Sequence, residues 1–392
     1  MLNALQRDSA TKEGLTMTED LVGYFERHLD ELMADLKGCV ERESPSGDKT
    51  AADRCGEYLA ELFRREGFQV ERLAQREVGD CIVARMGSGL RGTLCVGHYD
   101  TVFPIGFLQD CNPFRIEDGK AYGPGILDMK GGILMGLYAV KALRELGQLP
   151  EKRITFFLNS DEESGSFHSS ERILEEARRH DNVIVLEPGY DERGSMKRFR
   201  YGRATYEIIA HGRAAHSGTN PEDAISPLEE LSHQLLRLLE LNDPEGGVSV
   251  APTFLHGGIP GTCVVPESAS LGVDIRVRGV ERLEAIHRYV AALPPFLPGI
   301  RLEVRGGVDK PPLPVYPELI AMVEGFAREL GFPLLPKDCK GGSDGNFTGG
   351  AGIPTIDGVG MSGRYLHTRD EYINVGDIPR RTALAALLLK NL

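Results

Sequence analysis

The chain has 392 residues, of which 41% are hydrophobic and 26% are charged, and it contains 47 glycines. This length exceeds what one hydrophobic core usually supports, so we expect two domains in a turn-rich globular α/β protein. A formal net charge of -13 argues against nucleic acid and anionic membrane surfaces as partners, because both require clustered Lys and Arg.

The termini and cysteines indicate the compartment. Residues 1–19 carry scattered charges without the apolar stretch of a signal peptide, and we interpret them as a solvated tail. The sequence contains no run of 18 or more apolar residues, so we expect no membrane-spanning helix. The seven cysteines are odd in number and contain no Cys-x-x-Cys pair. This pattern argues against a disulfide framework or a thiolate zinc finger, so we expect a reducing, cytoplasmic location.

Residues 20–200 are expected to form the first part of an α/β domain. Helical periodicity covers residues 20–63, with a polar break at 43–48, and a further helix is predicted at 131–146. Short apolar runs predict strands at 68–73, 80–85, 93–96, 154–159 and 183–186. Strands and helices alternate in the manner of a sheet flanked by helices.

Residues 201–305 show a different pattern. Strand-like runs at 204–210 and 271–277 enclose helical stretches at 227–241 and 280–293, an arrangement long enough for a small α+β domain of its own. Residues 306–392 then return to a helix at 318–330, a Gly-rich loop at 341–352 and a final helix after Ile378. An inserted domain is the simplest account, with residues 306–392 completing the first domain.

Two polar residues, His98 and Asp100, directly follow the strand predicted at 93–96, in the segment Gly97-His98-Tyr99-Asp100. Residues two apart share a face of a strand, so His98 and Asp100 can point the same way. A metal-bound imidazole needs an acceptor for its second ring nitrogen, and Asp100 is placed to supply it or to support a neighbouring ligand. The alternative is a histidine that only satisfies a polar strand end.

An acidic residue lies in the glycine-flanked turn Gly123-Pro-Gly-Ile-Leu-Asp128, just before the helix predicted at 131–146. A carboxylate delivered by such a turn can bridge two cations with its two oxygens. Asp128 is also suited to capping the helix that follows, and the sequence leaves both interpretations open.

Adjacent carboxylates, Glu162 and Glu163, follow the strand predicted at 154–159. Such neighbours repel one another unless a cation or a shared proton offsets their charge. One glutamate binding metal while the other acts as general base would satisfy both, whereas a solvated acidic loop is the alternative. Glu187, after the strand at 183–186, and His367, near the C-terminus, are uninformative singly.

These residues gain meaning as a set. Ligands converge at the carboxyl edge of α/β sheets, and four of the residues follow strand ends or turns of one α/β region: His98, Asp128, Glu163 and Glu187. With His367 they give each of two cations one imidazole and one carboxylate, plus a shared carboxylate. Nitrogen and oxygen ligands without thiolates suit a catalytic zinc pair.

The ordered motifs GHYDTV, GPGILDMKGG, DEESG, LEPG and LHTRDEY resemble those of the co-catalytic zinc aminoacylase and carboxypeptidase family, peptidase family M20. The resemblance covers nearly the whole chain and favours the glutamate carboxypeptidase branch. It implies a mixed-sheet catalytic domain flanked by helices, with an inserted ferredoxin-like domain that serves as lid and dimerisation surface. It also implies a homodimer with two Zn²⁺ per chain, replaceable by Co²⁺ or Mn²⁺.

The resemblance assigns a role to each residue of the set. His98 and Glu187 would bind opposite zinc ions, Asp128 would bridge the two ions, and Glu163 and His367 would complete the two ligand sets. Glu162 would be the general base that takes a proton from the attacking water and passes it to the departing amine. Asp100 would support the ligands.

In the inserted segment, His216 resembles the lid histidine that reaches the partner subunit's active site and donates to the oxyanion. Arg276 resembles the arginine that clasps a substrate carboxylate, and the loop containing Gly342 resembles one that contacts the same group. Cys263 stands where the family usually carries Asn, which removes an amide and alters this substrate clamp.

The resemblance implies hydrolysis of an amide bond in a small N-acyl or peptidyl amino acid, releasing a C-terminal amino acid such as glutamate. An N-acyl-amino-acid deacetylase or desuccinylase of amino-acid biosynthesis is the second interpretation. A metal-binding pseudoenzyme without turnover is the third, and Glu162 argues against it because a binding protein has no need of a base.

Overall fold

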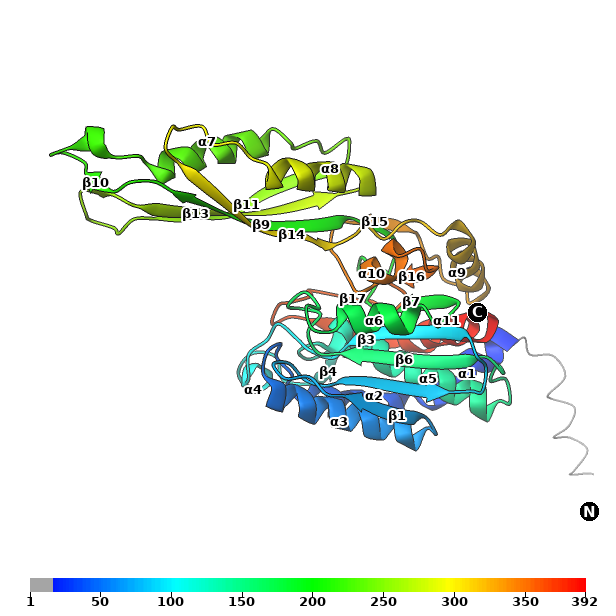
Figure 1. Cartoon of the computed structure of the whole chain (residues 1–392). Helices are drawn as coiled ribbons and strands as arrows, with labels where there is room; N and C mark the ends of the chain where they lie inside the picture. The colour runs from blue at the N-terminus through cyan, green and yellow to red at the C-terminus, as the bar shows by residue number, and fades with distance from the viewer. Residues whose placement is uncertain (1–16) are drawn as a thin grey trace, which may run out of the picture. The chain divides into compact units, whose positions relative to one another are not determined.

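The computed structural model describes residues 17–392 (Figure 1). The chain divides into two compact units. The first unit runs to Arg198 and also includes Pro314–Asp338 and Ser343–Leu392, whereas the second comprises Phe199–Leu313 and Cys339–Gly342. Residues 1–16 of the tail predicted at 1–19 lie outside the described residues. Helix α1 (Met17–Arg27) begins at the first described residue.

A six-stranded mixed sheet forms the centre of the first unit, in the order β1-β2-β6-β3-β7-β16. Strands β1 and β2 are antiparallel to their neighbours, and the other four are parallel to one another. The strands are β1 (Gln69–Leu73), β2 (Cys81–Met86), β3 (Gly92–His98), β6 (Arg153–Asn159), β7 (Asn182–Val185) and β16 (Thr355–Asp357). The first five match the predicted runs. Strand β16 has only three residues, too few to show a pattern.

Helices cover both faces of this sheet, as the mixed α/β fold class requires. The larger hydrophobic core lies between the sheet and a group of helices, and a smaller core lies under α6 (Ser170–Ala177) on the other face. The larger group contains α1, α2 (Leu29–Val40), α3 (Lys49–Arg65), α5 (Gly131–Glu145), α9 (Pro317–Glu329) and α11 (Ile378–Asn391). No helix within residues 17–392 is both long and apolar enough to cross a membrane.

The strands supply both cores because successive side chains point to opposite faces. Phe156 and Phe157 on β6 are both buried, but Phe156 belongs to the larger core and Phe157 to the smaller one. The Phe156 ring packs against Phe63, at a centroid distance of 4.8 Å, and against Phe68, at 5.6 Å. This aromatic group joins α3 to the centre of the sheet.

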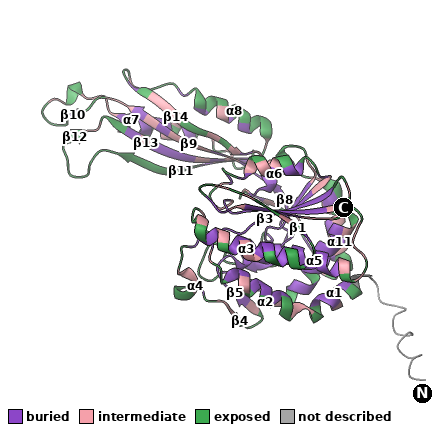
Figure 2. Cartoon of the chain, turned by 60° about the horizontal axis from the view of Figure 1, so that its bottom comes forward, coloured by how far each residue is buried: buried purple, intermediate pink, exposed green. Residues whose placement is uncertain are grey.

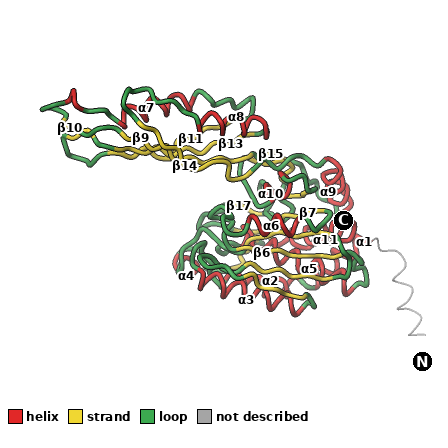
Figure 3. Tube along the Cα trace, in the orientation of Figure 1, coloured by secondary structure: helices red, strands yellow, loops and turns green. Residues whose placement is uncertain are grey.

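A small antiparallel sheet positions the C-terminal part of the chain. Its order is β17-β18-β5-β4, formed by β17 (Gly363–Arg364), β18 (Tyr372–Asn374), β5 (Lys120–Tyr122) and β4 (Arg115–Glu117). Tyr372 on β18 lies opposite Tyr122 on β5. The pairing therefore brings the loop between β17 and β18 beside the turn that follows β5. Figure 3 shows the loops of the first unit gathered at one end of the large sheet.

The second unit has the order β-α-β-β-α-β of a ferredoxin-like fold. Its antiparallel sheet has the strand order β11-β13-β9-β14. The elements are β9 (Gly202–His211), α7 (Pro227–Leu239), β11 (Val248–Gly257), β13 (Ser268–Val277), α8 (Val280–Ala291) and β14 (Arg301–Lys310). Both helices pack on one face of the sheet, and their outer sides are exposed (Figure 2).

Three local expectations were wrong. The sequence predicted only β9 and β13 as strands of this unit, because most of β11 is exposed and the glycines Gly306 and Gly307 interrupt β14. The segment 341–352 was expected to be a loop, but it contains the short helix α10 (Gly345–Gly350). Its glycines suppressed the helical pattern.

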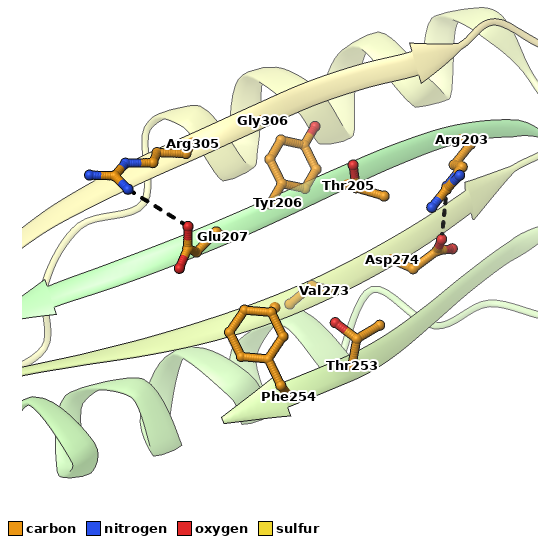
Figure 4. Close-up of a pocket in the computed structure, with 11 residues that line it drawn as sticks. Arg203, Thr205, Tyr206, Glu207, Thr253, Phe254, Val273, Asp274, Arg305 and Gly306 are labelled. Atoms are coloured by element: carbon orange, nitrogen blue, oxygen red, sulfur yellow. Dashed lines mark hydrogen bonds and ion pairs between the residues drawn. The ribbon is translucent and has the colours of Figure 1, made fainter. Parts of the chain in front are cut away.

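The uncovered face of the second unit's sheet is polar. It carries a hollow of about 360 Å³ whose lining includes Thr205, Phe254 and two ion pairs (Figure 4). Arg203 Nε lies 3.0 Å from an Asp274 carboxylate oxygen, and Arg305 Nη1 lies 3.8 Å from Glu207. Because these charges are already paired, they offer no unbalanced charge to a ligand.

We predict that Phe156→Ala destabilises the first unit by about 3–5 kcal/mol, because it removes a buried ring between two others and leaves a cavity. Urea unfolding followed by circular dichroism measures this change. Phe167→Ala is the matched control, since that ring is 70% exposed and its loss is expected to change stability by about 0.5 kcal/mol or less. Equal unfolding midpoints for the two variants would contradict the packing described above.

Candidate metal centre

Two of the predicted ligands leave the large sheet at the same edge. His98 is the last residue of β3, and Glu187 follows the end of β7 by two residues. These strands are parallel neighbours, with Val96 opposite Val185. Both side chains are buried, and His98 Nε2 lies 3.7 Å from Glu187 Oε1.

Asp128 stands between two histidines. It lies in the turn η1 (Ile126–Lys130), directly before α5. Its Oδ1 is 3.2 Å from His98 Nε2, and its Oδ2 is 3.2 Å from His367 Nε2. Helix α5 has Lys130 at its N-cap and no side-chain capping bond, so the capping interpretation of Asp128 is wrong.

The pairing of β18 with β5 brings the loop that carries His367 beside Asp128. His367 also contacts Glu163. Its Nε2 lies 3.0 Å from Glu163 Oε1. The described residues thus form two groups with ligand atoms within 4.8 Å of one another: His98, Asp128 and Glu187, and Asp128, Glu163 and His367. The expectation that His98 and Glu187 serve opposite ions was wrong, because their strands are adjacent.

Asp100 connects one ligand to the acidic loop. Its backbone oxygen lies 3.2 Å and its Oδ1 3.4 Å from His98 Nδ1, the nitrogen that faces away from Asp128. The Asp100 carboxylate also accepts hydrogen bonds from the backbone N–H of Glu162, at 3.3 Å, and of Glu163, at 3.1 Å. Ser46 Oγ donates to it at 2.6 Å. One buried carboxylate therefore orients both the imidazole and the two glutamates.

The electrostatics of the two groups favour positive charge. Burial lowers the pKa of His98, but hydrogen bonds to Asp100 and Asp128 outweigh burial and hold that pKa well above its usual value. Hydrogen bonds to Asp128 and Glu163 raise the pKa of His367 to about 10. Burial raises the pKa of Glu163 to about 7. Carboxylates packed this closely need protons on the rings or cations to offset their charge.

The donor set fits two divalent cations. It offers two imidazole nitrogens and three carboxylates, which are ligands that zinc takes in catalytic sites. Asp128 belongs to both groups, as a bridging carboxylate must. Glu162 belongs to neither group among the described residues, although its backbone is held beside them by Asp100.

Sequence reasoning gave no role to two buried residues of this centre. Glu371 accepts hydrogen bonds from the backbone N–H of Gly125 (3.2 Å), Leu127 (2.8 Å) and Asp128 (3.1 Å), and so supports the turn. Lys197 Nζ lies 3.0 Å from Glu187 Oε2. Glu371 falls within the LHTRDEY motif, and this position was the only feature of the sequence that could have indicated a role for it in the centre. Lys197 adjoins Arg198 and has the pattern of a solvated charge.

The remaining predicted site residues lie in the second unit. His216 ends the short strand β10 (Ala215–His216), which pairs with β12 (Val264–Val265) next to Cys263. His216 Nδ1 accepts hydrogen bonds from the backbone N–H of Gly218 and Thr219, at 3.1 and 3.0 Å. A neutral His216 ring therefore carries its proton on Nε2 and can donate from that atom.

Arg276 lies on β13 and forms a two-bond pair with Asp274, at 2.6 and 3.0 Å. Its Nη1 donates to the backbone oxygen of Lys340 at 3.3 Å. The backbone oxygen of the nearby Gly342 accepts from Arg200 Nη1 at 2.8 Å. The structure thus brings Arg276 beside the segment that contains Gly342, and His216 beside Cys263.

Comparison with known sequences gives a consistent result. The model of peptidase family M20/M25/M40 matches residues 94–391. Carboxypeptidase G2 from a Pseudomonas species is 32% identical over 369 residues, covering 91% of this chain and 88% of that protein. A succinyl-diaminopimelate desuccinylase from Methylorubrum populi is 29% identical over 359 residues, covering 85% of this chain and 92% of that protein.

Solved structures share the fold. Aminopeptidase PepT from Bacillus cereus aligns with a TM-score of 0.76 at 20% identity, covering 92% of this chain and 98% of that chain. An M20 metallo-carboxypeptidase from Sulfolobus solfataricus aligns with a TM-score of 0.72 at 18% identity, covering 92% and 99%. The matched residues include both ligand groups, and the chain belongs to peptidase family M20/M25/M40.

Proposed function

We propose that this protein is a two-zinc hydrolase that cleaves the amide bond of a small N-acyl or peptidyl amino acid and releases a C-terminal amino acid such as glutamate. The observation that carries this proposal is the Asp128 carboxylate, whose two oxygens each lie 3.2 Å from a different imidazole. Membership of the peptidase family and the likeness to carboxypeptidase G2 support an amide substrate.

One zinc ion would be held by His98, Asp128 and Glu187, and the other by Asp128, Glu163 and His367. Co²⁺ or Mn²⁺ can take the same ligands. When bound, the two ions supply Lewis acidity, which polarises the scissile carbonyl and lowers the pKa of water. The protein's own part is to hold Asp128 between the two rings.

Glu162 is the proposed general base. The Asp100 carboxylate holds the backbone of Glu162 and Glu163, so the two side chains start from fixed positions beside the ligand groups. Glu162 takes a proton from the attacking water and delivers it to the nitrogen of the departing amine, which balances the hydrolysis. Glu163 remains a ligand.

The proposed substrate-binding residues belong to the second unit. Asp274 fixes the orientation of the Arg276 guanidinium, which we assign to the substrate carboxylate together with the backbone at Gly342. His216 would donate from Nε2 to the oxyanion in a partner subunit's site, which requires a homodimer. Cys263 lies beside His216 and offers a thiol where the family usually has an amide. A cytoplasmic location suits the many thiols.

A deacetylase or desuccinylase activity is the second candidate. The likeness to succinyl-diaminopimelate desuccinylase over 85% of the chain favours it. The two candidates use the same ligands and base, and they differ in the acyl group that the substrate carries.

A substrate panel tests the proposed function. We expect the zinc-loaded protein to release free amino acid from peptidyl or aroyl glutamates faster than from acetyl or succinyl amino acids. A chelator should abolish the release, and Zn²⁺ or Co²⁺ should restore it. Amine release is measured with a fluorogenic reagent. A preference for succinyl or acetyl substrates would favour the second candidate, and no turnover on any carboxylate-bearing amide would refute both.

Glu162→Ala separates base from ligand. We expect this variant to retain about two zinc ions per chain by elemental analysis while kcat falls about 10²–10⁴-fold, because only proton transfer is removed. Glu175→Ala, an exposed change on α6, is the control and should leave both quantities unchanged. Loss of zinc from Glu162→Ala would mean that Glu162 is a ligand.

Glu371→Gln tests the support of the Asp128 turn. The variant replaces one acceptor oxygen with an NH₂ group that faces backbone N–H donors, so we expect zinc affinity to fall about 10–100-fold. Competition with a chromophoric chelator measures the affinity. Asp370→Asn, an exposed neighbour in the same loop, should bind zinc like the wild type. Equal affinities for the two variants would show that Glu371 does not hold the turn.

A further inference from the structure

We infer that Lys197 is a positioning residue that leaves one oxygen of Glu187, not both, for a metal ion. Lys197 Nζ donates to Glu187 Oε2 at 3.0 Å, and Glu187 Oε1 is the oxygen that lies 3.7 Å from His98 Nε2. The two oxygens of this carboxylate therefore face different partners, a lysine and a ligand imidazole. This inference rests on the proposed two-zinc function, and it makes the two metal positions of that function unequal.

The fold holds Lys197 in place. Lys197 is the first residue of β8 (Lys197–Arg200) and is 5% exposed. Gly358, which has a φ of +74°, lies against it: a Cβ atom on Gly358 would come within 2.7 Å of the Lys197 backbone nitrogen and 2.8 Å of its Cγ. Only glycine allows this close approach. Within residues 17–392, Glu187 is the one side chain that pairs with Lys197, so the ammonium has no competing side-chain acceptor there.

Glu187 is held at both ends. Its backbone oxygen accepts a hydrogen bond from the Gly360 N–H at 2.9 Å, and its side chain is buried beside His98 and Asp128. The carboxylate cannot turn both oxygens toward one cation without losing the bond to Lys197. Loss of that bond would leave a buried ammonium without its partner, which is costly. The ion pair therefore favours binding through one Glu187 oxygen.

The second ligand group has no such donor. Glu163 Oε1 lies 3.0 Å from His367 Nε2, and in the described part of the chain no lysine or arginine pairs with the Glu163 carboxylate. Glu163 can therefore offer both oxygens to a cation. The groups also differ in exposure, because the His98 side chain is 1% exposed and the His367 side chain is 47% exposed. One position is buried and limited in oxygen donors, whereas the other is open and richer in them.

This difference has a consequence for the choice of metal. Zn²⁺ is stable with four nitrogen and oxygen ligands, whereas Mn²⁺ favours octahedral sites with more oxygen donors. Withholding one Glu187 oxygen therefore favours Zn²⁺ over Mn²⁺ at the buried position. The open position, with both Glu163 oxygens available, discriminates less between the two ions. The role of Lys197 is thus to set the metal preference of the group that contains His98.

A metal competition experiment tests this role. The wild type, Lys197→Met and the control Lys141→Met are dialysed to equilibrium against excess Mn²⁺ with increasing Zn²⁺, and bound metal is measured by elemental analysis. Methionine keeps the length of the side chain and removes its charge and hydrogen bonds. Lys141 is a matched control because it is buried, pairs with Glu31 and lies outside both ligand groups.

We expect the preference for Zn²⁺ over Mn²⁺, at the position that Zn²⁺ fills first, to fall about 10–100-fold in Lys197→Met. The control should keep the wild-type preference. An unchanged preference in Lys197→Met, or an equal fall in the control, would overturn the inference while leaving the two-zinc function intact. Uptake of fewer than two cations per chain by the wild type would refute that function itself, so the two failures are distinguishable.

Crystals of the zinc-loaded wild type provide a test that needs no variant. We expect Glu187 to contact its cation through one oxygen while the other oxygen keeps its hydrogen bond to Lys197. Contact of both Glu187 oxygens with the cation, or a Lys197 side chain turned away from the carboxylate, would contradict the inference.

Discussion

The structure depends on the concentration of negative charge around Asp128. Three carboxylates and two imidazoles meet in the two ligand groups, and such a cluster is unstable unless positive charge offsets it. Neighbouring residues offset this repulsion by holding the segments or side chains that carry the three carboxylates. Asp100 holds the loop that carries Glu163, Lys197 pairs with Glu187, and Glu371 holds the turn that carries Asp128.

Much of the large sheet was predictable because its strands follow simple rules. The runs that became β3, β6 and β7 are short, apolar and bounded by turn residues, so each is recognisable without its neighbours. The small sheet gave no such pattern, because β5 and β18 have three residues each and depend on pairing between distant segments. Strand β11 was missed for another reason: most of it is exposed, so it lacks the alternation of a half-buried strand.

The ligand residues were predictable as a set because each motif places its polar residue at a strand end or turn. Their grouping was not predictable, since it depends on which strands are neighbours. His98 and Glu187 share a group because β3 lies beside β7, a fact of topology rather than of local sequence. Glu371 and Lys197 were missed because burial of a charged side chain is decided by tertiary packing. Their sequences read as solvent-facing.

The pairing of β18 with β5 has a consequence for the order in which the protein matures. Every residue of the first ligand group, His98, Asp128 and Glu187, precedes the second unit in the sequence. His367 and Glu371 follow the second unit in the sequence, so a chain that has reached Leu313 holds one complete ligand group on a turn that still lacks its Glu371 support. The second ligand group therefore cannot assemble before β18 has been made and has paired with β5, and any chain that stops short of His367 is left with the first group alone.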